Sequence, residues 1–213
     1  MCGRFANHVP AMHDWAAILK DWPAGIVVGF NVVPSQSIAV FTPEGGLAAR
    51  WGLVPPWSQT VSSKYATFNA RLESVADKPA FRSAWSHGQR CLIPAMGYYE
   101  WKTEAGAKQP YFVHGADGAP LVFAGLYEPG RGEEIPASCT IITRQADAEL
   151  EGLHARMPVM LAAPQSNDWL HGPLSAALQL ALGERPAAVD MYPVSREVNN
   201  PRNQGADLIR RLD

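Results

Sequence analysis

The sequence lacks an apolar run of the roughly 20 residues that a membrane-spanning helix needs. Its first residues also lack a basic region followed by an apolar stretch, so we expect no signal peptide. Cysteine is scarce, with three widely spaced residues, Cys2, Cys91 and Cys139. This small odd number argues against a disulfide framework and favours a reducing compartment. We therefore expect a cytoplasmic protein.

Several motifs of known enzyme classes are missing as well. No C-x-x-C or H-E-x-x-H motif indicates zinc, and no glycine-rich loop indicates a bound nucleotide. The G-x-S-x-G motif of serine hydrolases is also absent. We therefore expect neither a metal nor another cofactor.

The chain also lacks a large charge of one sign. Its net charge of −2 at pH 7 argues against a surface built to coat nucleic acid. However, 13 of the 18 basic residues are arginine, whose planar guanidinium suits phosphate. A local phosphate-binding groove thus remains open, and charge alone does not decide the partner.

Short apolar runs rich in β-branched and aromatic residues recur along the chain, each bounded by glycine, proline or aspartate. They predict strands at 37–41, 47–53, 90–93, 98–102, 111–114, 121–127, 139–143, 159–162 and 190–194. Residues 114–120 look like a hairpin tip that joins two of these strands. Helices are expected at 11–20, 79–87, 164–171 and 174–182. We therefore predict one domain over residues 1–213, of α+β class and mainly β, with a closed or half-closed barrel-like sheet and peripheral helices.

Cys2 is the most informative residue of the chain. If Met1 is removed, Cys2 carries a free amine of pKa about 8 and a free thiol of pKa about 8.5 on adjacent carbons. An aldehyde condenses with the amine to a Schiff base, and the thiol then closes a thiazolidine ring that resists hydrolysis. The alternative is an incidental or buried cysteine, which the Met-Cys pair alone favours.

Glu100 and His154 are candidate proton carriers. Glu100 has aromatic neighbours on a predicted strand, so we expect it to be partly desolvated, as suits a general acid or base. His154 precedes Arg156 by two residues, and in an extended segment both side chains face the same side. The alternatives are a solvent-facing or arginine-paired Glu100 and a histidine in a surface loop.

A third group of residues suits a nucleic-acid strand, because arginines bind phosphates and tryptophans stack on bases or wedge between them. These residues are Arg4, Arg71 and Arg156 for phosphates, and Trp51, Trp57 and Trp101 for bases. Since tryptophan is more often part of a core, we expect at least half of the seven to pack inside. Asn69 is a candidate partner for a carbonyl or hydroxyl at a reacting centre, although asparagine is common in turns.

Eight short motifs occur in order along the chain. They are Cys2-Gly-Arg-Phe, Asn31-Val-Val-Pro34, Trp51-Gly-Leu-x-Pro, Asn69-Ala-Arg-x-Glu73, Arg90-Cys-Leu-Ile-Pro94, Gly97-Tyr-Tyr-Glu-Trp101, His154-x-Arg-Met-Pro158 and Val198-Asn-Asn-x-Arg202. Each motif is weak alone. Together they resemble the SOS-response-associated peptidase (SRAP) family, the abasic-site-processing proteins, from residue 2 to about residue 209.

The resemblance implies a protein that recognises abasic sites in single-stranded DNA, including junctions at replication forks, and shields them by a thiazolidine DNA–protein crosslink. It also implies autocatalytic removal of Met1, a lyase-like Schiff-base step and crosslink reversal. The expected partner is DNA, at the nucleoid, with no membrane and no cofactor, and the working expectation is a monomer.

Residue roles carry over from the same resemblance. Cys2 is implied to be the nucleophile, Asn69 to position the opened sugar, Glu100 to shuttle protons, and His154 to assist ring opening and reversal. The implied DNA contacts are Arg4, Arg71 and Arg156 for phosphates and Pro34, Trp51 and Trp101 for the channel.

Two other functions stay open. Cys2, Glu100 and His154 are compatible with acyl transfer by a cysteine peptidase or N-terminal-nucleophile hydrolase acting on other proteins. No oxyanion motif supports that alternative. The second open function is a non-catalytic module that binds single-stranded nucleic acid, in which Cys2 is incidental.

Overall fold

The computed structural model describes residues 2–7, 19–61, 65–185 and 188–212 of the chain. Its strands are β1 (Phe5–Asn7), β2 (Gly29–Val32), β3 (Ser37–Thr42), β4 (Gly45–Trp51), β5 (Asn69–Arg71), β6 (Arg90–Ala95), β7 (Gly97–Glu104), β8 (Ala107–Gly115), β9 (Leu121–Glu128), β10 (Ser138–Gln145), β11 (Arg156–Pro158) and β12 (Val189–Pro193). The α-helices are α1 (Pro79–Ser86), α2 (Ser166–His171) and α3 (Leu174–Leu182). The predicted α+β, mainly β class is confirmed.

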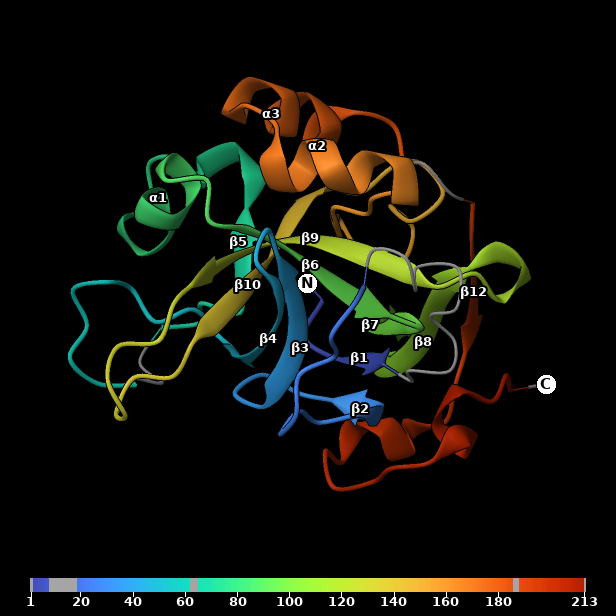
Figure 1. Cartoon of the computed structure of the whole chain (residues 1–213). Coiled ribbons are helices and arrows are strands. Elements are labelled where there is room, and N and C mark those ends of the chain that lie inside the picture. Colours follow the sequence, from blue (N-terminus) through green and yellow to red (C-terminus); the bar gives the residue numbers. More distant parts are fainter. Residues whose placement is uncertain (1, 8–18, 62–64, 186–187, 213) are drawn as a thin grey trace.

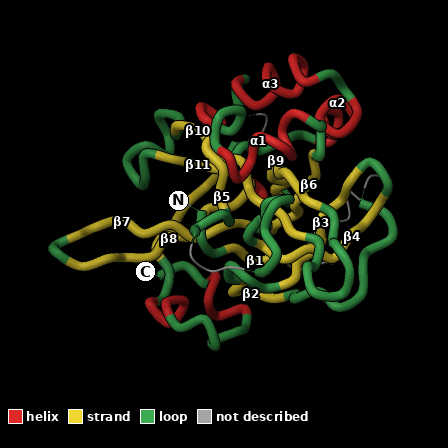
Figure 2. Tube along the Cα trace, turned by 90° about the vertical axis from the view of Figure 1, so that its left-hand side faces the viewer, coloured by secondary structure: helices red, strands yellow, loops and turns green. Residues whose placement is uncertain are grey.

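The strands form two sheets. One has the order β12-β8-β7-β1-β2, and the other has the order β11-β10-β4-β3-β6-β9 with β5 added on β10. Because β9 also pairs with β10, the strands β10, β4, β3, β6 and β9 form a ring. The central sheet is therefore ring-like, as the sequence predicted. Strand β1 lies between β7 and β2 in the first sheet (Figure 1), and the hairpin of β7 and β8 projects from one side of the molecule (Figure 2).

The ring closes at Gly125 in the middle of β9. A Cβ atom there would lie 2.9 Å from Cys91 Sγ on β6 and 2.9 Å from the Thr140 carbonyl oxygen on β10. Real Cβ atoms do not approach other atoms so closely, so a side chain at this position would push the flanking strands apart. Glycine thus allows β9 to run between β6 and β10.

The helices cover the outside of the ring-like sheet. Phe81 and Trp85 of α1 and Trp169 of α2 pack in one hydrophobic cluster with Leu92 of β6 and Leu126 of β9. The helices α2 and α3 lie together at one end of the molecule (Figure 1). Within the described residues, no helix has the length and apolar character needed to cross a membrane.

Most of the predicted elements are found close to their expected positions, but the strand at 159–162 is wrong. The strand there is β11, which ends at Pro158. After it the chain leaves β10, and Met160 makes an isolated bridge to Phe123 of β9. The apolar run is buried as it crosses between strands, so its hydrophobicity reflects packing and not a strand of its own.

The predicted hairpin at 114–120 is also wrong. The segment contains a short 3-10 helix, η3 (Ala116–Gly118), and connects β8 of one sheet with β9 of the other. The two strands pair with different neighbours, so the turn passes the chain between sheets. The predicted helix at 11–20 lies almost entirely outside the described residues, and the short strands β1, β2 and β5 were not predicted.

Arg90 joins the end of α2 to β6 and supports the helical cap. It is 4% exposed, donates hydrogen bonds to the carbonyls of Trp169 and Gly172, and lies 6.0 Å from the centre of the Trp169 ring. Arg90→Met leaves these carbonyls without their charged donor, so we expect a loss of about 2 kcal/mol in the free energy of unfolding. Denaturant titration measures it. Arg82→Met, at an exposed position on α1, is the control. An equal loss of stability in that variant would contradict the role of Arg90 in supporting the helical cap.

Candidate functional site

Cys2 is held inside the molecule, just before β1. Its side chain is fully buried in a hydrophobic cluster that also contains Tyr98 of β7 and Met157 of β11. The side-chain amide of Asn69, the first residue of β5, donates a hydrogen bond of 2.7 Å to the Cys2 carbonyl oxygen. Asn69 therefore fixes the backbone of Cys2, although the two residues are far apart in the sequence.

Glu100 is the third residue of this group. It lies on β7 and is only 5% exposed, which confirms the expected desolvation. Burial, and then the charge of Glu100, raise the pKa of the Cys2 thiol well above its usual value. Burial, followed by the charges of Cys2 and Glu100, likewise raises the pKa of Tyr98. The charge of Glu100 therefore acts on the Cys2 thiol within a buried environment.

A groove opens beside Asn69. Its cavity of about 690 Å³ is lined by Asn69 and Arg71 of β5 and by the exposed rings of Trp57 and Tyr65. The charged residues among its described lining are Arg71 and Lys78, with no carboxylate. Exposed rings and cations along one wall are features that bind a strand of nucleotides. Sequence analysis named Trp57, Arg71 and Asn69 separately, and the structure brings them together.

Arg4, two residues after Cys2, already binds other groups of the protein. Its guanidinium donates 2.7 Å to Asn31 Oδ1, donates to the Val198 carbonyl, and lies 5.8 Å from the centre of the Trp101 ring. Trp101 in turn donates 2.7 Å to Asn199 Oδ1. The predicted phosphate ligand Arg4 and the predicted base platform Trp101 thus form one unit, attached to the segment of η5 (Arg196–Asn199).

Trp51 occupies a different position from the one expected. It is 0% exposed, and its Nε1 donates 2.9 Å to the Phe68 carbonyl, next to Asn69. Its own carbonyl accepts 2.7 Å from Ser35, in the turn that carries half-buried Pro34. Because the ring has no exposed face, the expectation that it stacks on a base is corrected. Any effect of Trp51 on a DNA channel is indirect, through the two segments it supports.

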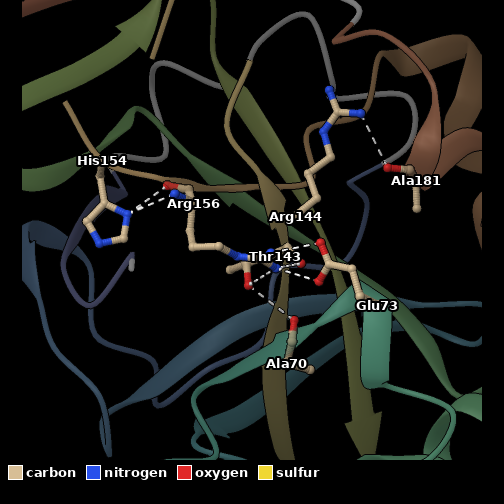
Figure 3. Close-up of polar contacts among 7 residues, drawn as sticks. All are labelled: Ala70, Glu73, Thr143, Arg144, His154, Arg156 and Ala181. Carbon is tan, nitrogen blue, oxygen red and sulfur yellow. Dashed lines mark hydrogen bonds and ion pairs between the residues drawn. The ribbon is translucent and has the colours of Figure 1, made fainter. Parts of the chain in front are cut away.

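Arg156 begins β11, which pairs with β10, and His154 lies two residues earlier (Figure 3). The backbone N–H of Arg156 is 2.9 Å from His154 Nδ1. The Arg156 side chain makes a two-pronged ion pair of 2.7 and 2.9 Å with Glu73 and donates 2.7 Å to the Thr143 carbonyl. These hydrogen bonds hold the pKa of Glu73 below its usual range. The predicted phosphate ligand Arg156 is therefore occupied by a carboxylate of the protein itself.

Comparisons with known proteins agree on one family. The sequence profile described as SOS response associated peptidase (SRAP) matches residues 1–201. The chain belongs to the SRAP family. Among its relatives, the abasic site processing protein YoaM of Bacillus subtilis is 36% identical over 222 residues, covering 98% of this chain and 97% of YoaM. The abasic site processing protein YedK of Escherichia coli is 32% identical over 227 residues, covering 99% of each chain.

The SRAP fold is confirmed by a solved structure. A crystal structure of a protein from Bordetella bronchiseptica superposes with a TM-score of 0.81, at 28% identity, over 91% of this chain and 100% of that one. Within the described residues of our SRAP protein, no group of three or more metal-ligating side chains could hold an ion.

Sequence reasoning missed two residues of this SRAP site. Asn31 is fully buried and donates to the carbonyls of Asn200 and Asn203, which ties Arg4 to the C-terminal segment. Glu73 holds Arg156. Both residues stand in motifs that carry the family resemblance, yet only their distant partners, visible in the structure, reveal what they do.

Proposed function

We propose that this protein recognises abasic sites in single-stranded DNA and shields them through a thiazolidine crosslink at Cys2, once Met1 is removed. The observation that carries the proposal is the group of buried Cys2, buried Glu100 and half-buried Asn69, beside a groove that Asn69 lines together with exposed rings and cations. Membership of the SRAP family and the printed names of its relatives as abasic site processing proteins support it.

The chemistry starts at the Cys2 amine. The amine adds to the aldehyde carbon of the ring-opened sugar, and the resulting carbinolamine loses water to give an imine. The Cys2 sulfur then bonds to the imine carbon while its proton passes to the nitrogen, which closes the ring. Overall, one aldehyde and one aminothiol give one thiazolidine and one water. Glu100 transfers the protons in both steps, and the reverse sequence releases the DNA.

Glu100 also serves the removal of Met1 in this proposal. The Met1–Cys2 peptide bond is cleaved by water, and the new amine takes up the proton that the reaction provides. Because the amine reacts only after this step, Met1 removal switches the site on. Glu100, already near the Cys2 thiol, is the group placed to move the proton.

Asn69 and His154 handle the sugar. Asn69 Nδ2 donates a hydrogen bond to the Cys2 carbonyl. The Asn69 Oδ1 is buried and has no hydrogen-bond partner in the described part of the chain. That oxygen is placed to accept a hydrogen bond from a sugar hydroxyl. His154 assists opening of the sugar ring and reversal of the crosslink, because an imidazole can both donate and accept a hydrogen bond.

The DNA strand follows the groove in this proposal. Trp57 stacks on a base next to the lesion, and Arg71 pairs with a phosphate. Arg4, Trp101 and Pro34 contact the strand on the other side of Cys2. The protein then covers the lesion on both sides, and the preference for single strands and junctions follows from the need to expose the sugar.

A cysteine peptidase acting on other proteins is the second candidate, because the family description contains the word peptidase. Cysteine peptidases favour the thiolate by lowering the pKa of their nucleophile. In this protein, burial and Glu100 raise the pKa of the Cys2 thiol. The geometry therefore suits ring closure with a proton-accepting carboxylate better than attack on peptides in trans.

The test mixes the protein, with Met1 removal confirmed by intact mass, with a labelled single strand that carries one abasic site. We expect a covalent band on a denaturing gel without borohydride, with the mass of protein plus DNA minus one water. The matched control strand carries a tetrahydrofuran analogue, which has the same shape but no aldehyde. No band with the aldehyde strand would refute the proposal, and turnover of a peptide library would then favour the peptidase.

Arg71→Gln should weaken binding of the tetrahydrofuran strand and flatten its salt dependence. Arg71 is exposed at the groove, so its phosphate contact releases counterions when DNA binds. We expect the slope of log affinity against log salt to fall by about 0.7 for this one contact. Fluorescence anisotropy over a salt series measures the slope. Exposed Arg82→Gln on α1 is the control, and equal slopes in the two variants would contradict the contact.

A further inference from the structure

Glu73 is part of the motif Asn69-Ala-Arg-x-Glu73, but the proposed chemistry gives it no role. It lies in η2 (Leu72–Ser74), immediately after β5, and its carboxylate binds both terminal nitrogens of Arg156, at 2.7 and 2.9 Å. A two-pronged pair of this kind fixes direction as well as distance. The Glu73 side chain is 51% exposed, whereas that of Arg156 is 16% exposed.

The ion pair joins two strands that do not pair with each other. Strand β5 runs parallel to β10, with Arg71 opposite Thr143, and β11 runs antiparallel to β10, with Pro158 also opposite Thr143. A strand residue has one neighbour on each edge, so β5 and β11 lie on opposite edges of β10. Glu73 and Arg156 bridge them across β10 at Thr143 (Figure 3).

Each bridged strand is next to one part of the proposed site. Asn69, which holds the Cys2 carbonyl, begins β5. His154 comes two residues before β11 begins at Arg156. Between the two strands, Thr143 Oγ1 of β10 donates a 3.3 Å hydrogen bond to the Ala70 carbonyl of β5. The Glu73–Arg156 ion pair therefore sets the spacing between β5, which carries Asn69, and the start of β11, which follows His154.

The backbone of Arg156, whose side chain Glu73 binds, contacts the His154 ring. The Arg156 backbone N–H lies 2.9 Å from His154 Nδ1, closer than the Arg156 carbonyl at 3.2 Å. An N–H group can only donate, so Nδ1 is the acceptor and the proton of the neutral ring is on Nε2. A fixed Arg156 thus keeps His154 in the tautomer that donates a hydrogen bond from Nε2.

We propose that Glu73 is a positioning residue: through Arg156 it fixes the distance between Asn69 and His154 across β10 and holds His154 in its Nε2–H tautomer. This inference rests on the proposed function, because it concerns the groups that handle the sugar. Glu73 itself touches neither sugar nor Cys2 in this scheme.

The first test is Glu73→Gln, which keeps the shape of the side chain and removes its charge. We expect the crosslinking rate at saturating DNA to fall about tenfold, the scale of a displacement well under 1 Å at a reacting centre. The dissociation constant for the tetrahydrofuran strand should stay equal or fall, because a negative charge beside the DNA is lost. Asp207→Asn, which removes the carboxylate of an exposed ion pair with Arg210, is the control with no expected change.

The second measurement is the nitrogen NMR spectrum of the His154 ring at a pH where the ring is neutral. We expect one tautomer, with its proton on Nε2, in the wild type and a mixture in Glu73→Gln. The inference holds if the rate falls without loss of affinity and the tautomer changes. It is overturned if the rate is unchanged, if rate and affinity fall together with the melting temperature, or if the tautomer is unaffected. If the wild type forms no crosslink, the proposed function is refuted. In that case the NMR spectra alone test whether Glu73 controls the tautomer of His154.

Discussion

In the Cys2→Ala protein, we expect the covalent band that forms without borohydride to fall to background, while affinity for the abasic strand persists. The alanine variant keeps the amine that Met1 removal exposes, but it has no sulfur to close the ring. The imine therefore remains open to water and reverts to aldehyde. Binding persists because the groove residues Trp57 and Arg71 and the unit of Arg4 and Trp101 are untouched.

Borohydride separates the two steps of the reaction in this variant. Reduction traps an imine, so Cys2→Ala should give a band only when borohydride is present, whereas the wild type needs none. The control is Cys139→Ala, which removes another fully buried thiol from β10 and should leave the band intact. A borohydride-independent band in Cys2→Ala would show that the stable bond does not involve the Cys2 sulfur.

The sequence predicts the chemical residues from their reactivity and from the ordered motifs, and their roles stay predictions. The Met-Cys pair alone favours an incidental cysteine, and the other motifs in order change that interpretation, while a carboxylate among aromatic neighbours indicates burial. The structure then brings together Cys2, Asn69 and Glu100 from β5, β7 and the segment before β1. The sequence does not show directly that these residues are close in space, because their proximity results from long-range strand pairing.

The roles of arginine and tryptophan were harder to predict. Arg4, Arg71 and Arg156 look alike in the sequence, yet Arg71 is exposed, whereas Arg4 and Arg156 bind Asn31 and Glu73. Each of those partners comes from a distant segment. For the same reason Trp51 lies in the core and Trp57 at the surface, although only a few residues separate them.

The connection between β8 and β9 shows what turn residues in a sequence do not predict. Its glycines and proline predict a connection between two strands, but local signals do not say whether the strands pair. Here β8 pairs with β7 and β12, while β9 pairs with β6 and β10. Sheet membership is decided by the faces that each strand buries, which depends on the whole fold.

Glu100→Gln should slow crosslinking by about 10² to 10⁴, the usual contribution of a positioned proton carrier. Glutamine keeps the size of the side chain and its place on β7, but it cannot exchange protons at neutral pH. Both water loss from the carbinolamine and ring closure need a proton moved. The buried position, 5% exposed, leaves little bulk water to take over that task.

The direction of the effect distinguishes two roles of the carboxylate. The charge of Glu100 contributes to raising the pKa of the Cys2 thiol, after burial, so Gln should make the thiolate easier to form. If thiol ionisation limited the rate, Glu100→Gln would therefore react faster than the wild type. We expect slower reaction, because proton delivery to and from the sugar outweighs the easier ionisation.

The measurement must separate this effect from Met1 removal, since a retained Met1 would block the amine. We would expose Cys2 in both proteins by cutting a tag immediately before it, confirm the N-terminus by intact mass, and follow single-turnover crosslinking at saturating abasic strand. Glu104→Gln, at the far end of the same strand, is the matched control. A rate for Glu100→Gln equal to or above that of the wild type would remove Glu100 from the proton pathway and leave it an electrostatic influence on the thiol alone.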